Sequence, residues 1–257
     1  MEERQQQNYT IAEGYELPSK GLIYEGVSVN PHVDLRSMTA RDEMKRLNSS
    51  TTPFKTLATL IENCMLEKPA IPVYDMAFGD YEFLLHKLRI VSYGDEYKMT
   101  VTCPFCGSVL NTVVHLDDLE IKEFDQETFD SLRTFTLPDC KRLVTIKIQT
   151  PHILDNIDNR TRDLEKRFKD SEIDFRTFIL VQEAIDKVDG EKLSQIELEK
   201  FINNLSSKDF IKIQNNFAQL STCIGIDTQF IAECPHCKNE VKTFFRFEPE
   251  FFRPTNI

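Results

Sequence analysis

"TCPFCG" (residues 102–107) and "ECPHCK" (residues 233–238) are near-copies of one hexapeptide, and they stand far apart in the chain. Together they hold four of the seven cysteines: Cys103, Cys106, Cys234 and Cys237. The duplication allows two interpretations. Each copy is a separate redox centre, or the two copies are the halves of a single site.

The sequence around both copies has the alternation of β-hairpins. "EYKMTVT" precedes the first copy and "SVLNTVVHL" follows it, with apolar and polar residues in turn. "QFIAECPHCKNEVKTFFRF" alternates in the same way on both sides of the second copy. A period of two is typical of strands with one buried face. We therefore predict hairpins over residues 95–116 and 229–248, an internal repeat of one unit.

Thiol–disulfide oxidoreductases also use CPxC sequences, so the redox interpretation has to be weighed. Their reactive thiol lies at the first turn of a helix, whose positive end lowers its pKa. Here strand-like residues follow each pair, for example Val109 and Val113 after the first and Val241 after the second. The required strand–helix arrangement is missing, and the sequence disfavours redox catalysis.

A single zinc site explains both copies. Zn²⁺ prefers four ligands in a tetrahedron, and four thiolates form a closed structural site with no open position for substrate or water. We predict that Cys103, Cys106, Cys234 and Cys237 bind one structural Zn²⁺ and join the two hairpins as a split zinc ribbon. The long insertion between the copies is no obstacle, because loop-closure entropy grows slowly with length.

Neighbours of the cysteines fit knuckle-shaped turns. Gly107 is expected to supply the positive φ that follows such a pair. The second copy departs from this pattern, with Lys238 at that place and Asn239 next to it, and asparagine tolerates the left-handed region. His236 lies inside CPHC, but with four sulfurs available we expect it to be exposed rather than a ligand.

The rest of the chain predicts an α+β fold. Helices are expected over residues 39–47, 53–65 and 80–94, the first capped by Ser37 or Thr39 and the last stopped by Gly94. A further hairpin is expected over residues 134–150 and helices over 151–222. The predicted units are an extended N-terminal arm (1–35), a helical and β body with the split ribbon (36–150 plus 223–257), and a helical insertion lobe (151–222).

Within 151–222 the periodicity predicts one broad helical face that runs from Leu164 through Phe168 to Val188. Ser194 with Glu197 has the spacing of a capping box, and Ser206 or Ser207 is expected to cap the next helix. Four residues elsewhere resemble functional groups but are expected to be structural: His86 as a packed helix residue, and Cys64, Cys140 and Cys223 as plain buried thiols.

Composition and charge exclude several classes of function. Hydrophobic residues make up 40% and charged residues 28%, as in ordinary globular proteins. The formal net charge of −11 opposes binding to nucleic acid or to anionic membranes. Neither a membrane span nor a signal peptide is evident, so we expect a reducing environment without structural disulfides.

Five segments, in order, carry a resemblance to a known family: "LPSKG" (17–21), "RSMTARDE" (36–43), "IENC" (61–64), "FLLHKLRIVSYG" (83–94) and "CPFCG" (103–107). In order and spacing they resemble the baseplate hub assembly proteins of T-even-like contractile-tailed bacteriophages. The resemblance covers about residues 15–121. The helical segment 151–222 and the second cysteine pair lie outside it.

The resemblance implies a non-enzymatic structural or assembly protein of the tail baseplate. Such a protein would dock to other phage tail and baseplate proteins, and a multi-copy assembly is compatible with this role. It would be found in the virion, or in the host cytoplasm during assembly. The alternative is a zinc-ribbon regulatory protein that binds nucleic acid, with Lys98, Lys238, Lys242 and Arg246 around the metal. These cations are few against the overall negative charge, and we expect no nucleic acid and no membrane as partner.

Overall fold

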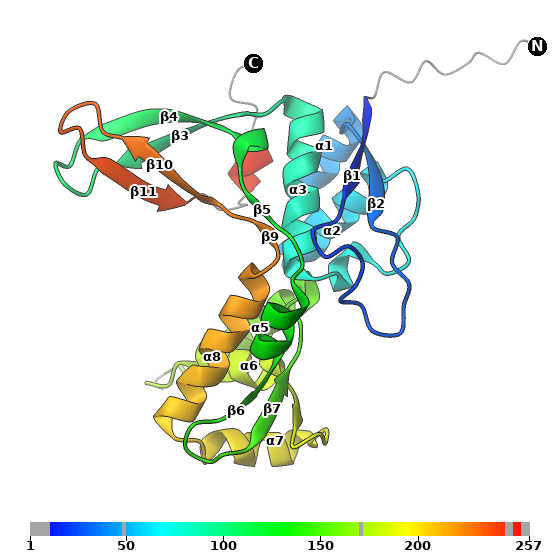
Figure 1. The fold of residues 1–257 in the computed structure, drawn as a ribbon, viewed down its shortest axis with the longest axis vertical. Coiled ribbons are helices and arrows are strands. Elements are labelled where there is room, and N and C mark those ends of the chain that lie inside the picture. Colours follow the sequence, from blue (N-terminus) through cyan, green and yellow to red (C-terminus); the bar gives the residue numbers. More distant parts are fainter. Residues whose placement is uncertain (1–10, 48–49, 170–171, 245–248, 253–257) are drawn as a thin grey trace, which may run out of the picture.

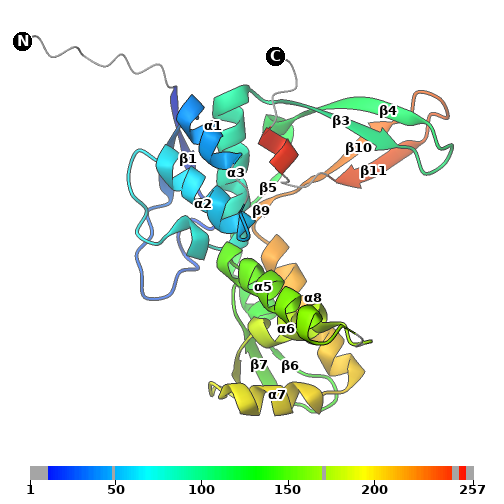
Figure 2. The same cartoon turned by 180° about the vertical axis from the view of Figure 1, so that it is seen from behind.

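The computed structural model describes residues 11–47, 50–169, 172–244 and 249–252. It confirms the α+β class, with helices and small antiparallel sheets. Figure 1 shows three parts: a helical part around α3 with β1 and β2 against it, two hairpins (β3–β4 and β10–β11) that extend together to one side, and a lower part with α5 to α8 and β6–β7. The same arrangement is seen from behind in Figure 2.

The helices in chain order are α1 (Ala40–Arg46), α2 (Pro53–Cys64), α3 (Phe78–Tyr93), α4 (Gln126–Arg133), α5 (Pro151–Arg167), α6 (Phe175–Ala184), α7 (Gln195–Asn203) and α8 (Ser207–Thr222). Short 3-10 turns are η1 (Val73–Asp75), η2 (Leu116–Asp118) and η3 (Pro249–Phe252). The strands are β1 (Ala12–Glu16), β2 (His32–Arg36), β3 (Glu96–Thr102), β4 (Val109–His115), β5 (Ile121–Lys122), β6 (Thr134–Thr136), β7 (Leu143–Ile146), β8 (Ile185–Val188), β9 (Gly225–Ile226), β10 (Gln229–Glu233) and β11 (Glu240–Phe244).

Each sheet is small and antiparallel. The pairs are β1–β2, β3–β4, β5–β9 and β10–β11, and β6–β7–β8 forms a three-stranded sheet. The hairpins predicted over 95–116 and 229–248 are present as β3–β4 and β10–β11, although residues 245–248 lie outside the described part. The hairpin predicted over 134–150 is confirmed as β6–β7.

Local sequence signals account for the helix ends. Thr39 caps α1 in a capping box with Asp42, since each side chain accepts a hydrogen bond from the other's backbone N–H. Pro53 occupies the first turn of α2, where its missing N–H has no partner to lose. Gly94 ends α3 with a φ of 85°. These three predictions are confirmed.

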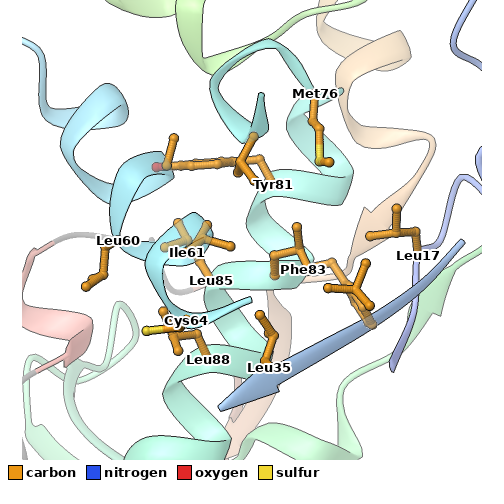
Figure 3. Packing of buried hydrophobic residues seen from close by; sticks show 14 of the residues in the cluster. Leu17, Leu35, Leu60, Ile61, Cys64, Met76, Tyr81, Phe83, Leu85 and Leu88 are labelled. Atoms are coloured by element: carbon orange, nitrogen blue, oxygen red, sulfur yellow. The ribbon is translucent and has the colours of Figure 1, made fainter. Parts of the chain in front are cut away.

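The first hydrophobic core surrounds α3, which is buried on most sides. Figure 3 shows Ile61 and Cys64 of α2 lying against Leu85 and Leu88 of α3, with Leu35 of β2 beside them. All five side chains are fully buried. Because this helix contacts α2, β1, β2 and the β9 strand, it is the element on which the other parts are assembled.

The segment before β2 packs onto the same helix. Its first residues, 1–10, lie outside the described part, but Leu17 and Ser19 are fully buried. The Asp80 carboxylate of α3 accepts hydrogen bonds from the backbone N–H and hydroxyl of Ser19 and from the Tyr24 hydroxyl. These bonds satisfy a carboxylate that is wholly shielded from water, and they fasten the extended segment to α3.

His86 is a packed helix residue, as predicted. Its side chain is 1% exposed, and Nε2 lies 2.9 Å from the carbonyl oxygen of Leu116. Burial lowers the pKa of His86 from 6.5 to about 4, since a charged ring would lose its hydration there. The neutral ring with its proton on Nε2 can donate to that carbonyl.

We expect His86 to make the protein less stable in mild acid. The unfolded chain takes up a proton at this histidine near pH 6.5, but the folded chain does so only near pH 4. The contribution of the neutral His86 to the free energy of unfolding is therefore fully present above pH 6.5 and is lost as the pH falls from 6.5 to about 4. The loss should reach up to about 3 kcal/mol. Urea unfolding of the native protein and His86→Gln at several pH values measures it. Equal pH dependence of the two proteins would contradict this account.

The second core joins β6–β7–β8 to α4 and the helices α5 to α8. Val144 and Ile146 of β7, Val181 of α6 and Ile213 of α8 are all fully buried in it. This cluster therefore contains residues from both sides of position 151. The predicted division at 151 and 222 stays a prediction.

One expectation for this region is wrong. The predicted helical face continued to Val188, but residues 185–188 form strand β8, which pairs with β7. Phe168, expected inside, is 55% exposed at the end of α5. The apolar residues Ile185 and Val188 suit a short strand as well as a helix, and only the distant β7 edge selects the strand. The capping box of Ser194 with Glu197 and the Ser206 cap are confirmed.

Two glycines bring α3 and β9 into backbone contact. A Cβ on Gly79 would lie 2.2 Å from the carbonyl oxygen of Ile224, and a Cβ on Gly225 would lie 2.8 Å from the Cα of Gly79. Gly225 also has a φ of +110°, which other residues rarely adopt. The chain thus returns from α8 past the start of α3 at a distance that side chains would prevent.

Candidate metal centre

Both CPxC segments fold into the same turn. The N–H of Gly107 donates to the carbonyl of Cys103, and the N–H of Lys238 donates to the carbonyl of Cys234, both at 2.9 Å. Likewise the N–H of each first cysteine donates to the carbonyl five residues on, in Ser108 and in Asn239. The duplicated sequence therefore forms a duplicated structure, with its thiols presented at the end of each hairpin.

The two turns face each other and bring the four cysteines together. The Sγ atoms of Cys103, Cys106, Cys234 and Cys237 all lie within 4.8 Å of one another. Across the hairpins, Cys103 is 3.7 Å from Cys237 and Cys106 is 3.7 Å from Cys234. A disulfide needs sulfurs about 2 Å apart, so these are free thiols.

The arrangement of the sulfurs fits one tetrahedral metal ion. With metal–sulfur distances of about 2.3 Å, tetrahedral geometry places thiolates about 3.8 Å apart. The two cross-hairpin distances are close to that value. The four cysteines could therefore hold a metal ion, and the all-sulfur donor set favours a soft or borderline cation.

The surroundings of the thiols differ. Hydrogen bonds from the Ser108 side chain and backbone lower the pKa of Cys106 to about 6. Hydrogen bonds from the backbone of Cys237 and of His236 lower the pKa of Cys234. Burial raises the pKa of Cys103 to about 11. A bound cation would replace the proton that Cys103 otherwise keeps at neutral pH.

A small apolar cluster supports the centre. Val101 and Leu110 of the first hairpin pack against Ala232 and Val241 of the second, together with the buried Cys103 and Cys234. So few buried side chains make a weak core, because stabilisation by burial scales with the apolar area removed from water. The hairpins thus need a further link between them, and the four sulfurs are placed to provide one.

Arg89 of α3 anchors the base of the first hairpin. Its buried guanidinium donates to the carbonyls of Gly94 and Glu96, at 2.7 and 3.1 Å, and to that of Phe251 at 3.1 Å. Three backbone acceptors compensate for the lost hydration of the charge. This contact, which the sequence did not reveal, connects α3, the start of β3 and η3.

The left-handed residue of the second turn is Lys238, with a φ of 60°, and not its neighbour Asn239, although asparagine tolerates this region. Lys238 is aligned with Gly107, whose φ is 72°. Asn239 has a different part in the turn, since its Nδ2 lies 3.4 Å from the Sγ of Cys237. The first copy also has a polar residue, Ser108, two places after its second cysteine, so this position could have been recognised from the sequence.

We expect glycine to be better than lysine at position 238. A side chain in the left-handed region costs about 1 kcal/mol, and the exposed ion pair of Lys238 with Glu233 adds little. Lys238→Gly should therefore stabilise the hairpins. Gly107→Ala should destabilise them by a similar amount, because no atom lies within 4 Å of the new Cβ and the backbone strain at its positive φ is the remaining cost. Thermal unfolding of both variants decides the question. Shifts of the same sign would contradict it.

The other residues that the sequence singled out differ in their exposure. His236 is exposed, as expected. Cys64 is buried and Cys223 partly so, but Cys140 is exposed, which corrects its assignment as a buried thiol. Lys98, Lys238 and Lys242 are exposed on the hairpins, whereas Arg246 lies outside the described residues.

Comparison with known proteins identifies the family. No helix among the described residues is long and apolar enough to span a membrane. Searches of curated proteins and of solved structures found no match. A family model described as "T4 bacteriophage base plate protein" matches residues 14–253, which include both cysteine pairs and the helices between them. The chain therefore belongs to the T4 bacteriophage base plate protein family.

Proposed function

We propose that this baseplate protein is a non-enzymatic hub component or hub assembly factor that acts by docking to other tail proteins. The match to the family over residues 14–253 is the observation that carries the proposal. The four-cysteine cluster supports it, because a closed thiolate site leaves no position where a substrate could bind the metal.

The proposed cofactor is one structural Zn²⁺ held by Cys103, Cys106, Cys234 and Cys237. All-sulfur tetrahedral sites suit zinc, which has no redox chemistry of its own. The small apolar cluster between the hairpins supports a structural role, because it includes two of the cysteines and, with so few side chains, joins the hairpins only weakly. With the metal in place, the hairpins would form one rigid projection.

The three predicted units of the chain are proposed as separate docking surfaces. We propose that residues 1–35, the body (36–150 plus 223–257) and the 151–222 segment contact different neighbours in the tail. The β6–β7–β8 sheet would join the last of these to the body, because it combines strands from both. The protein would act in the virion tail, or in the host cytoplasm while baseplates are built.

A protein inventory of purified particles tests the proposed place of action. If the protein is a permanent hub component, it will be present in mature virions and in isolated baseplates in a fixed ratio to other baseplate proteins. If it acts only in assembly, it will be present in baseplate intermediates and absent from virions. Its absence from both, in infected cells that contain the protein, would overturn the proposal.

A further inference from the structure

The two hairpins of the projection differ in charge although they share one structure. Between Lys98 and His115 the sequence "MTVTCPFCGSVLNTVV" has no charged residue, in a chain of which 28% is charged. The second hairpin, by contrast, exposes Glu233, Lys238 and Glu240. Charged side chains are a usual means by which proteins prevent strand edges from pairing with other chains. Strand β4 of the first hairpin lacks this protection, because Val109–His115 include no Asp, Glu, Lys or Arg.

The strand β4 has a free edge. Its sheet contains only β3 and β4 among the described residues, so β4 pairs with β3 on one side and with no strand on the other. Over most of its length β4 lies on the side of the hairpin away from β10 and β11 (Figures 1 and 2). Val109 and Val113 on this strand are 62% and 45% exposed. The edge therefore has both unpaired backbone groups and accessible apolar side chains.

The outward side chains of β4 form a palindrome. Val109, Asn111 and Val113 alternate outward, while Leu110 and Val114 are buried. If two copies of β4 pair antiparallel about Asn111, Val109 of each copy lies opposite Val113 of the other, and the two Asn111 residues lie opposite each other. Every cross-strand pair is then uncharged, and the β-branched pairs are favourable. A two-fold interface requires such self-complementarity.

We propose that the free edge of β4 is a self-association site, at which two copies of this chain pair antiparallel about Asn111. A seven-residue strand buries less than the roughly 1,200–2,000 Å² of stable interfaces, so the dimer is weak and dissociable. The net charge of −11 on each copy opposes it, and salt screens that repulsion. Dimerisation therefore strengthens as salt concentration rises. This inference does not depend on the proposed hub function.

Substitutions at the two-fold axis test the site. Asn111→Lys and Asn111→Glu each place like charges opposite each other in the dimer, and Asn111 is exposed, so the fold should tolerate both. Sedimentation velocity of the metal-loaded protein should show a concentration-dependent dimer for the native chain. For each variant alone, the dissociation constant of the dimer should be about fivefold higher than for the native chain, or more. An equimolar mixture of the two variants should recover the association, because opposite charges then meet at the axis.

The second hairpin supplies the matched control. Gln229 is likewise an exposed strand residue, in β10, and Gln229→Lys and Gln229→Glu should leave the dimer unchanged. A native chain that stays monomeric up to near-millimolar concentration would overturn the proposal. So would a dimer that is insensitive to both Asn111 variants, or variants whose mixture associates no better than either one alone.

Discussion

Cys103→Ser is expected to separate the two hairpins and to abolish assembly. The substitution leaves three sulfurs, and structural zinc sites contribute about 10–16 kcal/mol in small zinc-binding peptides. Little else joins the hairpins, since their shared apolar cluster consists of a few side chains around the cysteines themselves. Hydrogen exchange in residues 96–115 and 229–244 should therefore become much faster. Exchange in α3, which lies in a separate core, should change far less.

The exposed Cys140 provides the matched control. It is remote from the clustered ligand atoms, so Cys140→Ser should leave exchange in both hairpins unchanged and should support normal particles. In phage carrying Cys103→Ser, baseplates should fail to form because the projection is misfolded. Normal particles together with unchanged exchange in the hairpins would refute the idea that this cysteine is essential to the fold.

Gly79→Ala is expected to destabilise the protein strongly, although it only replaces a hydrogen by a methyl group. Alanine is favoured over glycine in a helix by about 1 kcal/mol, so propensity alone predicts stabilisation. The new Cβ would, however, lie 2.2 Å from the backbone oxygen of Ile224, and backbone cannot rotate away as a side chain can. We expect a net loss of about 3 kcal/mol or more, as the α3–β9 junction has to open.

Thermal unfolding checks this prediction, with a fall in Tm of about 6–12 °C for a chain of this length. Gly26→Ala serves as the control, because Gly26 has a positive φ of 74° but no atom within 4 Å of its Cβ position. Its strain alone should cost about 1 kcal/mol. A Gly79→Ala protein that melts higher than the native one would mean that the junction is looser than the structure shows.

The features that the sequence predicted correctly depend on neighbouring residues. Thr39 with Asp42, Pro53 and Gly94 mark helix ends through contacts within one turn, so they can be recognised without the fold. The alternation around each cysteine pair likewise predicts its own hairpin. The closeness of the two pairs in space was predicted from chemistry, because a shared metal site accounts for a duplicated thiol motif in two strand-flanked copies better than two redox centres do.

The features that the sequence did not predict depend on partners far along the chain. Residues 185–188 become a strand because β7 offers an edge more than thirty residues earlier in the chain. Helix α4 and the short β5–β9 pair have too few residues for a clear period. The closeness of Gly79 to Gly225 and the three carbonyls around Arg89 are visible only once the chain is folded. Such contacts position the projection, and no local pattern encodes them.

Native mass spectrometry of the purified chain at neutral pH tests the central claim most directly. We predict one bound zinc ion per chain, lost together with the four-cysteine cluster in Cys103→Ser and retained in Cys140→Ser. A native chain that carries no metal under these conditions, or one in which Cys103, Cys106, Cys234 and Cys237 are oxidised to two disulfides, would contradict the claim that a single ion joins the two hairpins.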